Sequence, residues 1–157
     1  MIKKIFFTIL LIGLLPLTGC AGYKPIFSSN NLDFTITEYT ISGNKRLGKQ
    51  LYSKLYNLSK SKKENRDRNI ILLIDMSSNK NETSKDSSGK VLEYKITLNT
   101  KIKIRDSSNN NIILDEIFIR SSSYKVQSQY SETLKLENTS TENLMNQIYQ
   151  DLLIKFA

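Results

Sequence analysis

The chain of 157 residues has no histidine, no tryptophan, one cysteine and two prolines. Without an imidazole it lacks the side chain that most often acts as a base near neutral pH, and it cannot form a histidine-containing zinc site. A single cysteine excludes a disulfide within the chain. No glycine-rich phosphate loop, paired CxxC motif or EF-hand spacing is present either. These absences remove much enzyme chemistry and leave packing as the source of stability.

Carboxylates and hydroxyls do not replace the missing groups. Asp115 and Glu116 are adjacent in one predicted strand, and neighbouring strand residues point to opposite faces, so the two carboxylates cannot act as a pair. Serine is abundant, but no serine has a histidine partner to activate it. We therefore expect that the protein is not an enzyme and that it binds no cofactor or metal.

The N-terminus has the parts of an export signal. Lys3 and Lys4 supply positive charge, residues 5–17 are apolar, and small residues then lead to Cys20. The apolar run is shorter than the roughly 20 residues that a transmembrane helix needs. The stretch Leu-Thr-Gly-Cys that ends at Cys20 resembles the lipobox of bacterial lipoproteins, in which cleavage precedes a cysteine that then carries acyl chains such as palmitate. The pattern predicts a lipoprotein signal peptide over residues 1–19 and lipidation of Cys20.

Lipidation would attach the mature protein to a membrane without spanning it. Each buried methylene contributes about 0.8 kcal/mol, so several acyl chains hold a protein on a bilayer where one does not. In lipoproteins of this kind an aspartate after the cysteine usually marks the inner membrane, and Ala21 stands there instead. We therefore expect an outer-membrane protein whose domain faces the periplasm. The alternative is an ordinary signal peptide with an incidental cysteine.

The net charge of +8 favours anionic partners. Export from the cytoplasm argues against nucleic acid as that partner. The length after residue 19 is typical of one domain. Residues 20–31 contain Pro25 and a polar SSNN run, and they predict a lipidated tether. Residues 32–157 are expected to form a single α+β domain.

The first half of this domain predicts a strand, a helix and a second strand. Residues 32–41 alternate like a strand with a bulge near Thr37 or Glu38. A helix follows, capped by Ser42 or Asn44, and Gly48 weakens it by about 1 kcal/mol relative to alanine. Four leucines form its apolar stripe: Leu47, Leu51, Leu55 and Leu58. Residues 60–68 predict a loop, residues 70–76 a buried strand and residues 77–90 a long mobile loop.

The second half shows the clearest alternation in the chain. Residues 91–105 predict a strand with one buried and one wet face, followed by a turn over residues 106–111 and a strand from 112 to about 127. Matching apolar side chains pairs Ile104 with Ile113, and that register places Lys101 against Glu116.

A final helix completes the predicted domain. Thr139 and Glu142 have the spacing of a capping box, although the helix could start earlier, at Ser131. The order β-α-β-β-β-α predicts an α+β fold: a four-stranded, mostly antiparallel sheet with two helices packed on one face.

Four basic residues are candidates for binding phosphate groups on the outer face of this sheet: Lys101, Lys103, Arg105 and Arg120. In the register above, Lys95 and Lys125 would join them. The alternative is a solvated sheet face, because lysine in strands also deters edge-to-edge aggregation.

The lipobox, the segment Gly-Tyr-Lys-Pro-Ile-Phe over residues 22–27 and the order of elements together resemble the LptE family of lipopolysaccharide-assembly lipoproteins. The stretch Arg-Leu-Gly-Lys-Gln-Leu over residues 46–51 and the segment 124–131 are also similar to alphaproteobacterial members. The resemblance implies an outer-membrane lipoprotein seated in an LptD-type β-barrel, which it helps to assemble, and a role in delivering lipopolysaccharide to the cell surface. Of the site residues, only Cys20 transfers from the family pattern.

A second reading stays open on the sequence alone. The same anchor and fold would suit a periplasmic adaptor lipoprotein that serves another envelope or transporter complex without a barrel partner.

Overall fold

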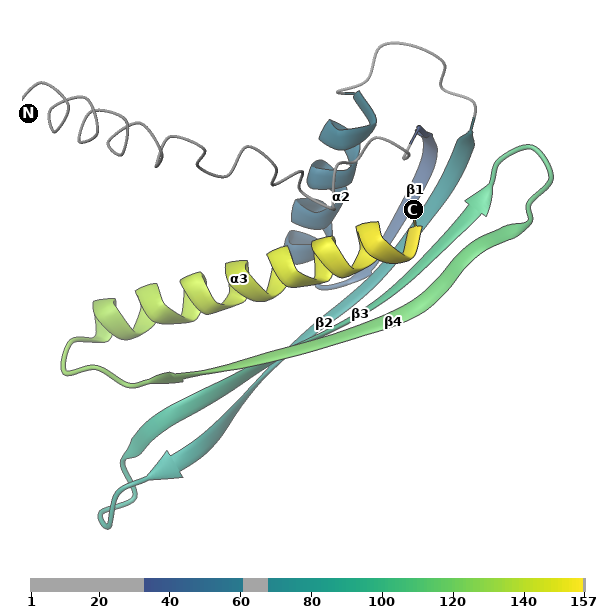
Figure 1. Ribbon diagram of the computed structural model, residues 1–157. Coiled ribbons are helices and arrows are strands. Elements are labelled where there is room, and N and C mark those ends of the chain that lie inside the picture. The colour runs from purple at the N-terminus through teal and green to yellow at the C-terminus, as the bar shows by residue number, and fades with distance from the viewer. Residues whose placement is uncertain (1–32, 61–67, 157) are drawn as a thin grey trace, which may run out of the picture.

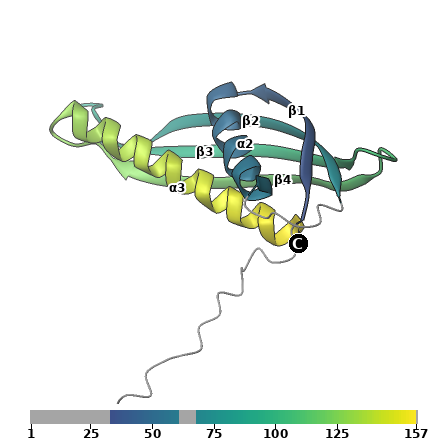
Figure 2. The same cartoon turned by 90° about the horizontal axis from the view of Figure 1, so that it is seen from above.

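The computed structural model describes residues 33–60 and 68–156. Its elements are β1 (Thr35–Gly43), α2 (Lys45–Lys60), β2 (Asn69–Lys85), β3 (Val91–Asp106), β4 (Ile112–Lys125) and α3 (Tyr130–Phe156). The strands form one sheet in the order β1-β2-β3-β4, in which β1 and β2 are parallel and the other pairs antiparallel. Both helices lie on the same face of this sheet (Figures 1 and 2). The predicted α+β fold and element order are confirmed, whereas Cys20, the signal peptide and the tether lie outside the described residues.

The predicted irregularity in β1 is present. The pairing of β1 with β2 shifts between Ile36 and Glu38, and the hydroxyl of Thr37 donates to the carbonyl oxygen of Ile70 over 3.0 Å. The bulge exchanges the faces of the strand, so that Tyr39 and Ile41 turn toward α2. One extra residue therefore brings both ends of β1 against the helical layer.

The cap of α2 is Asn44, one of the two predicted residues. Its side-chain oxygen accepts a hydrogen bond from the backbone nitrogen of Leu47 over 3.2 Å. Three leucines of the predicted stripe are buried and Leu58 is half-buried. Gly48 is buried against β1, where a Cβ atom would lie 2.4 Å from Cγ2 of Ile41. The glycine that weakens the isolated helix thus permits the close approach of α2 to β1.

The prediction of a mobile loop over residues 77–90 is wrong. Strand β2 continues to Lys85 and pairs with β3 along this whole length, leaving a turn in which Asp86 accepts hydrogen bonds from Ser88 and Lys90. Residues 77–85 are exposed, so no apolar alternation marks them as a strand. Backbone pairing with β3 holds them instead. The resulting β2–β3 hairpin extends beyond the rest of the sheet in Figure 1.

The register predicted for β3 and β4 is wrong by one residue. Ile104 pairs with Leu114 rather than Ile113, and Lys101 pairs with Ile117 rather than Glu116. Strand β4 carries apolar residues at both odd and even positions, so a match of apolar pairs has two solutions. Leu114, Phe118 and Tyr124 occupy the buried side because the two helices can cover them.

The last helix starts earlier than its capping box. It begins at Tyr130, close to the Ser131 alternative, and Thr139 and Glu142 lie inside it. The hydroxyl of Thr133 accepts a hydrogen bond from the backbone nitrogen of Gln127 over 2.8 Å, which joins the helix to the preceding segment. Near the other end, Phe156 packs edge-on against Phe34 with ring centroids 5.2 Å apart. The described parts of α2 and α3 contain no helix long and apolar enough to cross a bilayer.

Candidate functional site

The outer face of the sheet, opposite the helices, carries three of the four predicted phosphate contacts. Lys101, Lys103 and Arg105 alternate in β3 with buried residues, and they therefore point away from the core. Lys95 and Lys125 occupy the same parity in the observed register. The expectation of cations on this face is confirmed for β3.

Carboxylates accompany these cations. Nζ of Lys103 lies 3.0 Å from Oδ2 of Asp115, and Nζ of Lys101 lies 3.9 Å from its Oδ1. The hydrogen bond from Lys103 lowers the pKa of Asp115 below its ordinary value. Asp75 is the cross-strand partner of Lys101 on β2. The outer face is consequently a mixed-charge surface rather than a purely basic one.

Exposed apolar side chains also lie on this face. Ile117 and Ile119 are 58% and 55% exposed, although the predicted register put them in the core. Ile71 and Leu73 of β2 are half-buried on the same side. The signal for this was the presence of isoleucine at both parities of β4, which a strand with one wet face does not need.

Arg120 does not belong to the outer face. It lies on the helical side of β4, where its Nη2 is 2.6 Å from Oδ2 of Asp151 in α3. The contact is an ion pair without the geometry of a hydrogen bond at that oxygen. The four predicted residues thus separate into three on one face and one on the other, because the observed register reverses the parity assigned to Arg120.

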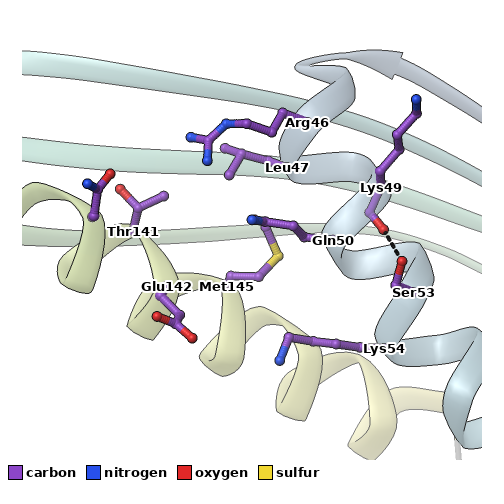
Figure 3. Close-up of a pocket in the computed structure, with 10 residues that line it drawn as sticks. Arg46, Leu47, Lys49, Gln50, Ser53, Lys54, Thr141, Glu142 and Met145 are labelled. Atoms are coloured by element: carbon purple, nitrogen blue, oxygen red, sulfur yellow. Dashed lines mark hydrogen bonds between the residues drawn. The ribbon is translucent and has the colours of Figure 1, made fainter.

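A groove of about 660 Å³ separates α2 from α3. Figure 3 shows Arg46 and Lys54 on its α2 side and Glu142 and Met145 on its α3 side. Lys49 also lines it, and its carbonyl oxygen accepts a hydrogen bond from Ser53 over 2.9 Å. With three cations and one carboxylate, the groove can hold an anion.

Helix α2 as a whole is strongly basic. Its sequence, KRLGKQLYSKLYNLSK, contains five basic residues and no aspartate or glutamate. The sequence interpretation placed these cations off the leucine stripe and assigned them no role. The absence of any acidic residue over 16 residues was the signal that could have identified this surface.

The hairpin meets α3 through a polar cluster. Glu137 Oε2 accepts hydrogen bonds from Lys80 over 2.6 Å and from the hydroxyl of Tyr124 over 2.8 Å. Nζ of Lys80 also lies 4.6 Å from the centroid of the Tyr94 ring. Burial alone would raise the pKa of Glu137, but these hydrogen bonds outweigh it and lower the pKa. The cluster fixes the base of the hairpin to the helical layer.

The described residues contain no group of three potential metal ligands among Cys, Asp and Glu. Asp115 and Glu116 point to opposite faces of β4, as the sequence indicated. The absence of enzyme activity remains a prediction.

No protein-family model and no curated protein sequence matches this chain. Its fold is similar to three solved structures. They are the rare lipoprotein B from Shewanella oneidensis (13% identity, 75% of this chain and 91% of that one, TM-score 0.51), a minor lipoprotein from Acinetobacter baumannii (13%, 79% and 90%, 0.55) and lipoprotein B from Nitrosomonas europaea (17%, 84% and 88%, 0.54). At these identities the likeness establishes a shared fold: this chain has the fold of these bacterial lipoproteins.

Proposed function

We propose that the protein is a lipid-anchored outer-membrane lipoprotein that acts as the plug subunit of a lipopolysaccharide translocon. In this role it assists assembly of an LptD-type β-barrel and the delivery of lipopolysaccharide to the cell surface. One combined observation carries the proposal. A fold shared with proteins described as lipoproteins follows, in this sequence, an export signal that ends in the lipobox cysteine Cys20.

The outer face of the sheet supports a partner inside a barrel. The inner wall of such a barrel is polar, and a plug therefore needs charged side chains with a limited apolar area. The ion pairs of Lys101 and Lys103 with Asp115 lie beside exposed Ile117 and Ile119 on this face. We assign the barrel contact to this surface.

The phosphates of lipopolysaccharide are the second proposed ligand. Lys101, Lys103 and Arg105 can reach a ligand on the outer face, where Asp115 competes for two of these three cations. Arg120 would have to exchange Asp151 for the ligand on the other face. Charge reversal of all four residues should weaken lipopolysaccharide binding, and unchanged binding would remove them as contacts.

Co-purification tests the partner. The full-length protein with a C-terminal tag is extracted from native outer membranes in mild detergent, and its bound proteins are identified by mass spectrometry. A large β-barrel at about one-to-one stoichiometry is expected. Recovery with inner-membrane transporter subunits, or of the protein alone, would instead favour the periplasmic adaptor.

The anchor has its own test. Metabolic labelling with a radioactive fatty acid should mark the wild-type chain and leave the Cys20→Ser variant unlabelled. Labelling of the variant would contradict lipidation at this cysteine.

A further inference from the structure

A stripe of tyrosines and lysines covers the flank of α2 that faces β1. Helix α2 lies between β1 and α3 in Figure 2, so one flank faces the groove and the other faces the edge of the sheet. The stripe follows helical spacing and consists of Lys45, Lys49, Tyr52, Tyr56 and Lys60. Tyr39 of β1 joins it, because the bulge turns this residue toward the helix.

The tyrosine rings form a continuous stack. The centroids of Tyr39 and Tyr52 are 4.0 Å apart, and those of Tyr52 and Tyr56 are 5.7 Å apart. Nζ of Lys60 lies 4.6 Å from the centroid of the Tyr56 ring and continues the stack. Tyr39 is 51% exposed and the other two rings are half-buried. The protein therefore presents an ordered aromatic surface to its surroundings.

The charge around this stack has one sign. Lys45, Lys49 and Lys60 are exposed, and α2 contains no acidic residue. Glu38 is the acidic residue of β1 and directly precedes Tyr39, so it points to the opposite face of the strand. A partner of this surface would thus meet positive charge and aromatic rings together.

That combination suits the headgroup region of a bilayer. Tyrosine places its ring among acyl chains and its hydroxyl in water, and it is enriched at membrane interfaces for this reason. Lysine binds anionic headgroups and can bury its methylene stem while its charge stays in water.

The position of the stripe agrees with the anchor. Figure 1 shows the last turn of α2 at the end of the sheet where β1 begins, and β1 is the first described element after the tether. The 13 residues from Cys20 to Asp33 span at most about 45 Å when extended, whereas the 16-residue helix is about 24 Å long. A lipid chain on Cys20 can therefore hold the whole stripe against the leaflet that carries it.

We infer that the Tyr39, Tyr52 and Tyr56 stack with its three lysines is a docking surface for anionic phospholipid headgroups, which orients the domain on its membrane. This inference rests on the proposed function only for the anchor at Cys20. The barrel contact was assigned to the opposite face of the sheet, so one molecule can use both surfaces at once.

Vesicle binding tests the stripe without the anchor or a barrel. The chain from residue 20 onward, carrying Cys20→Ser, is sedimented with vesicles of phosphatidylglycerol or of phosphatidylcholine. Binding to the anionic vesicles alone is expected, and it should weaken as salt screens the charges. Each lysine near an anionic surface contributes a factor of about five, so K45Q/K49Q/K60Q should lower the partition coefficient roughly 100-fold. Substitution of the exposed rings in Y39S/Y56S should also weaken binding.

A matched variant controls for net charge. K95Q/K101Q/K125Q removes three lysines from the outer face and should change binding less than about threefold, because these side chains face away from the membrane. An equal loss in both triple variants would overturn the inference, and so would a failure of the parent chain to bind phosphatidylglycerol. Circular dichroism verifies that each variant is folded.

A fluorescent reporter locates the contact. The chain has no tryptophan, so Tyr56→Trp introduces its one indole. Its emission should shift to the blue with phosphatidylglycerol vesicles. Sedimentation without such a shift would mean that another surface docks. A failed co-purification with a barrel would leave these results unaffected, and failed vesicle binding would leave the barrel partner unaffected, so the two proposals fail separately.

Discussion

Lys80 and Glu137 form an ion pair of 2.6 Å across 57 residues of sequence. Lys80 belongs to the exposed half of β2 and Glu137 to the first half of α3, and neither belongs to the apolar core. Together with the hydroxyl of Tyr124, they connect the projecting hairpin to the helical layer. The extended end of the sheet thus depends on polar contacts, whereas its other end depends on packing.

This cluster should make stability depend on pH. Hydrogen bonds hold the pKa of Glu137 below that of an unfolded glutamate, so its contribution is present above the unfolded pKa and is lost as pH falls through the folded pKa. The pair is partly exposed, and we expect Glu137→Gln to cost about 0.2–1 kcal/mol at pH 7 and low salt. Urea unfolding should show this difference disappearing in acid. A difference that is equal at neutral and acid pH would contradict the assignment.

Gly48→Ala should destabilise the protein despite the higher helix propensity of alanine. Alanine gains about 1 kcal/mol in a helix, but its Cβ would lie 2.4 Å from Cγ2 of Ile41, and such overpacking costs about 1–3 kcal/mol. Thermal unfolding of Gly48→Ala, Ile41→Ala and the double variant forms a cycle. The double variant should be more stable than the sum of the single effects predicts. Strict additivity would show that the two residues do not conflict.

Thr100→Val should stabilise the protein. Thr100 is fully buried on the helical side of β3, and its Oγ1 has no hydrogen-bond partner. A buried hydroxyl without a partner costs about 1–3 kcal/mol, and valine has nearly the same shape without it. Urea unfolding should show a higher midpoint with an unchanged slope. Thr97→Val, on the outer face of the same strand, is the control and should have little effect; a lower midpoint for Thr100→Val would indicate a partner for its hydroxyl.

Two neighbouring residues of β4 test the observed register. Phe118 is 8% exposed and faces the helices, so Phe118→Ala should cost about 3–5 kcal/mol. Ile117 is 58% exposed, so Ile117→Ala should stay within about 0.5 kcal/mol of the parent. Chemical denaturation measures both. The opposite ranking would restore the register in which Ile117 is buried.

Local patterns predicted the elements where one face of the backbone is buried. Alternation in residues 91–105 marked β3, and the spacing of Leu47, Leu51 and Leu55 marked α2. These patterns failed where burial does not distinguish two faces. The second half of β2 is exposed on both sides, and β4 is apolar on both, so neither carried a usable period.

The candidate sites followed the same division. The cations of β3 were located correctly because their strand alternates, but Arg120 was assigned to the wrong face along with the register of β4. The tyrosine stack was missed because it joins β1 to α2, and no spacing within either element reveals the contact between Tyr39 and Tyr52.

The sequence by itself determined the order of elements, the bulge in β1 and the α+β class, because each follows from the periodicity and chemistry of neighbouring residues. Only the tertiary structure decided which side of β4 is buried, how far β2 extends and which carboxylate accompanies each cation. The physical reason is that periodicity reports the geometry of one segment, whereas the choice between two apolar faces depends on what packs against them. Here α2 and α3 cover Leu114 and Phe118, and this choice places Ile117, Ile119 and the ion pairs of Asp115 on the open face.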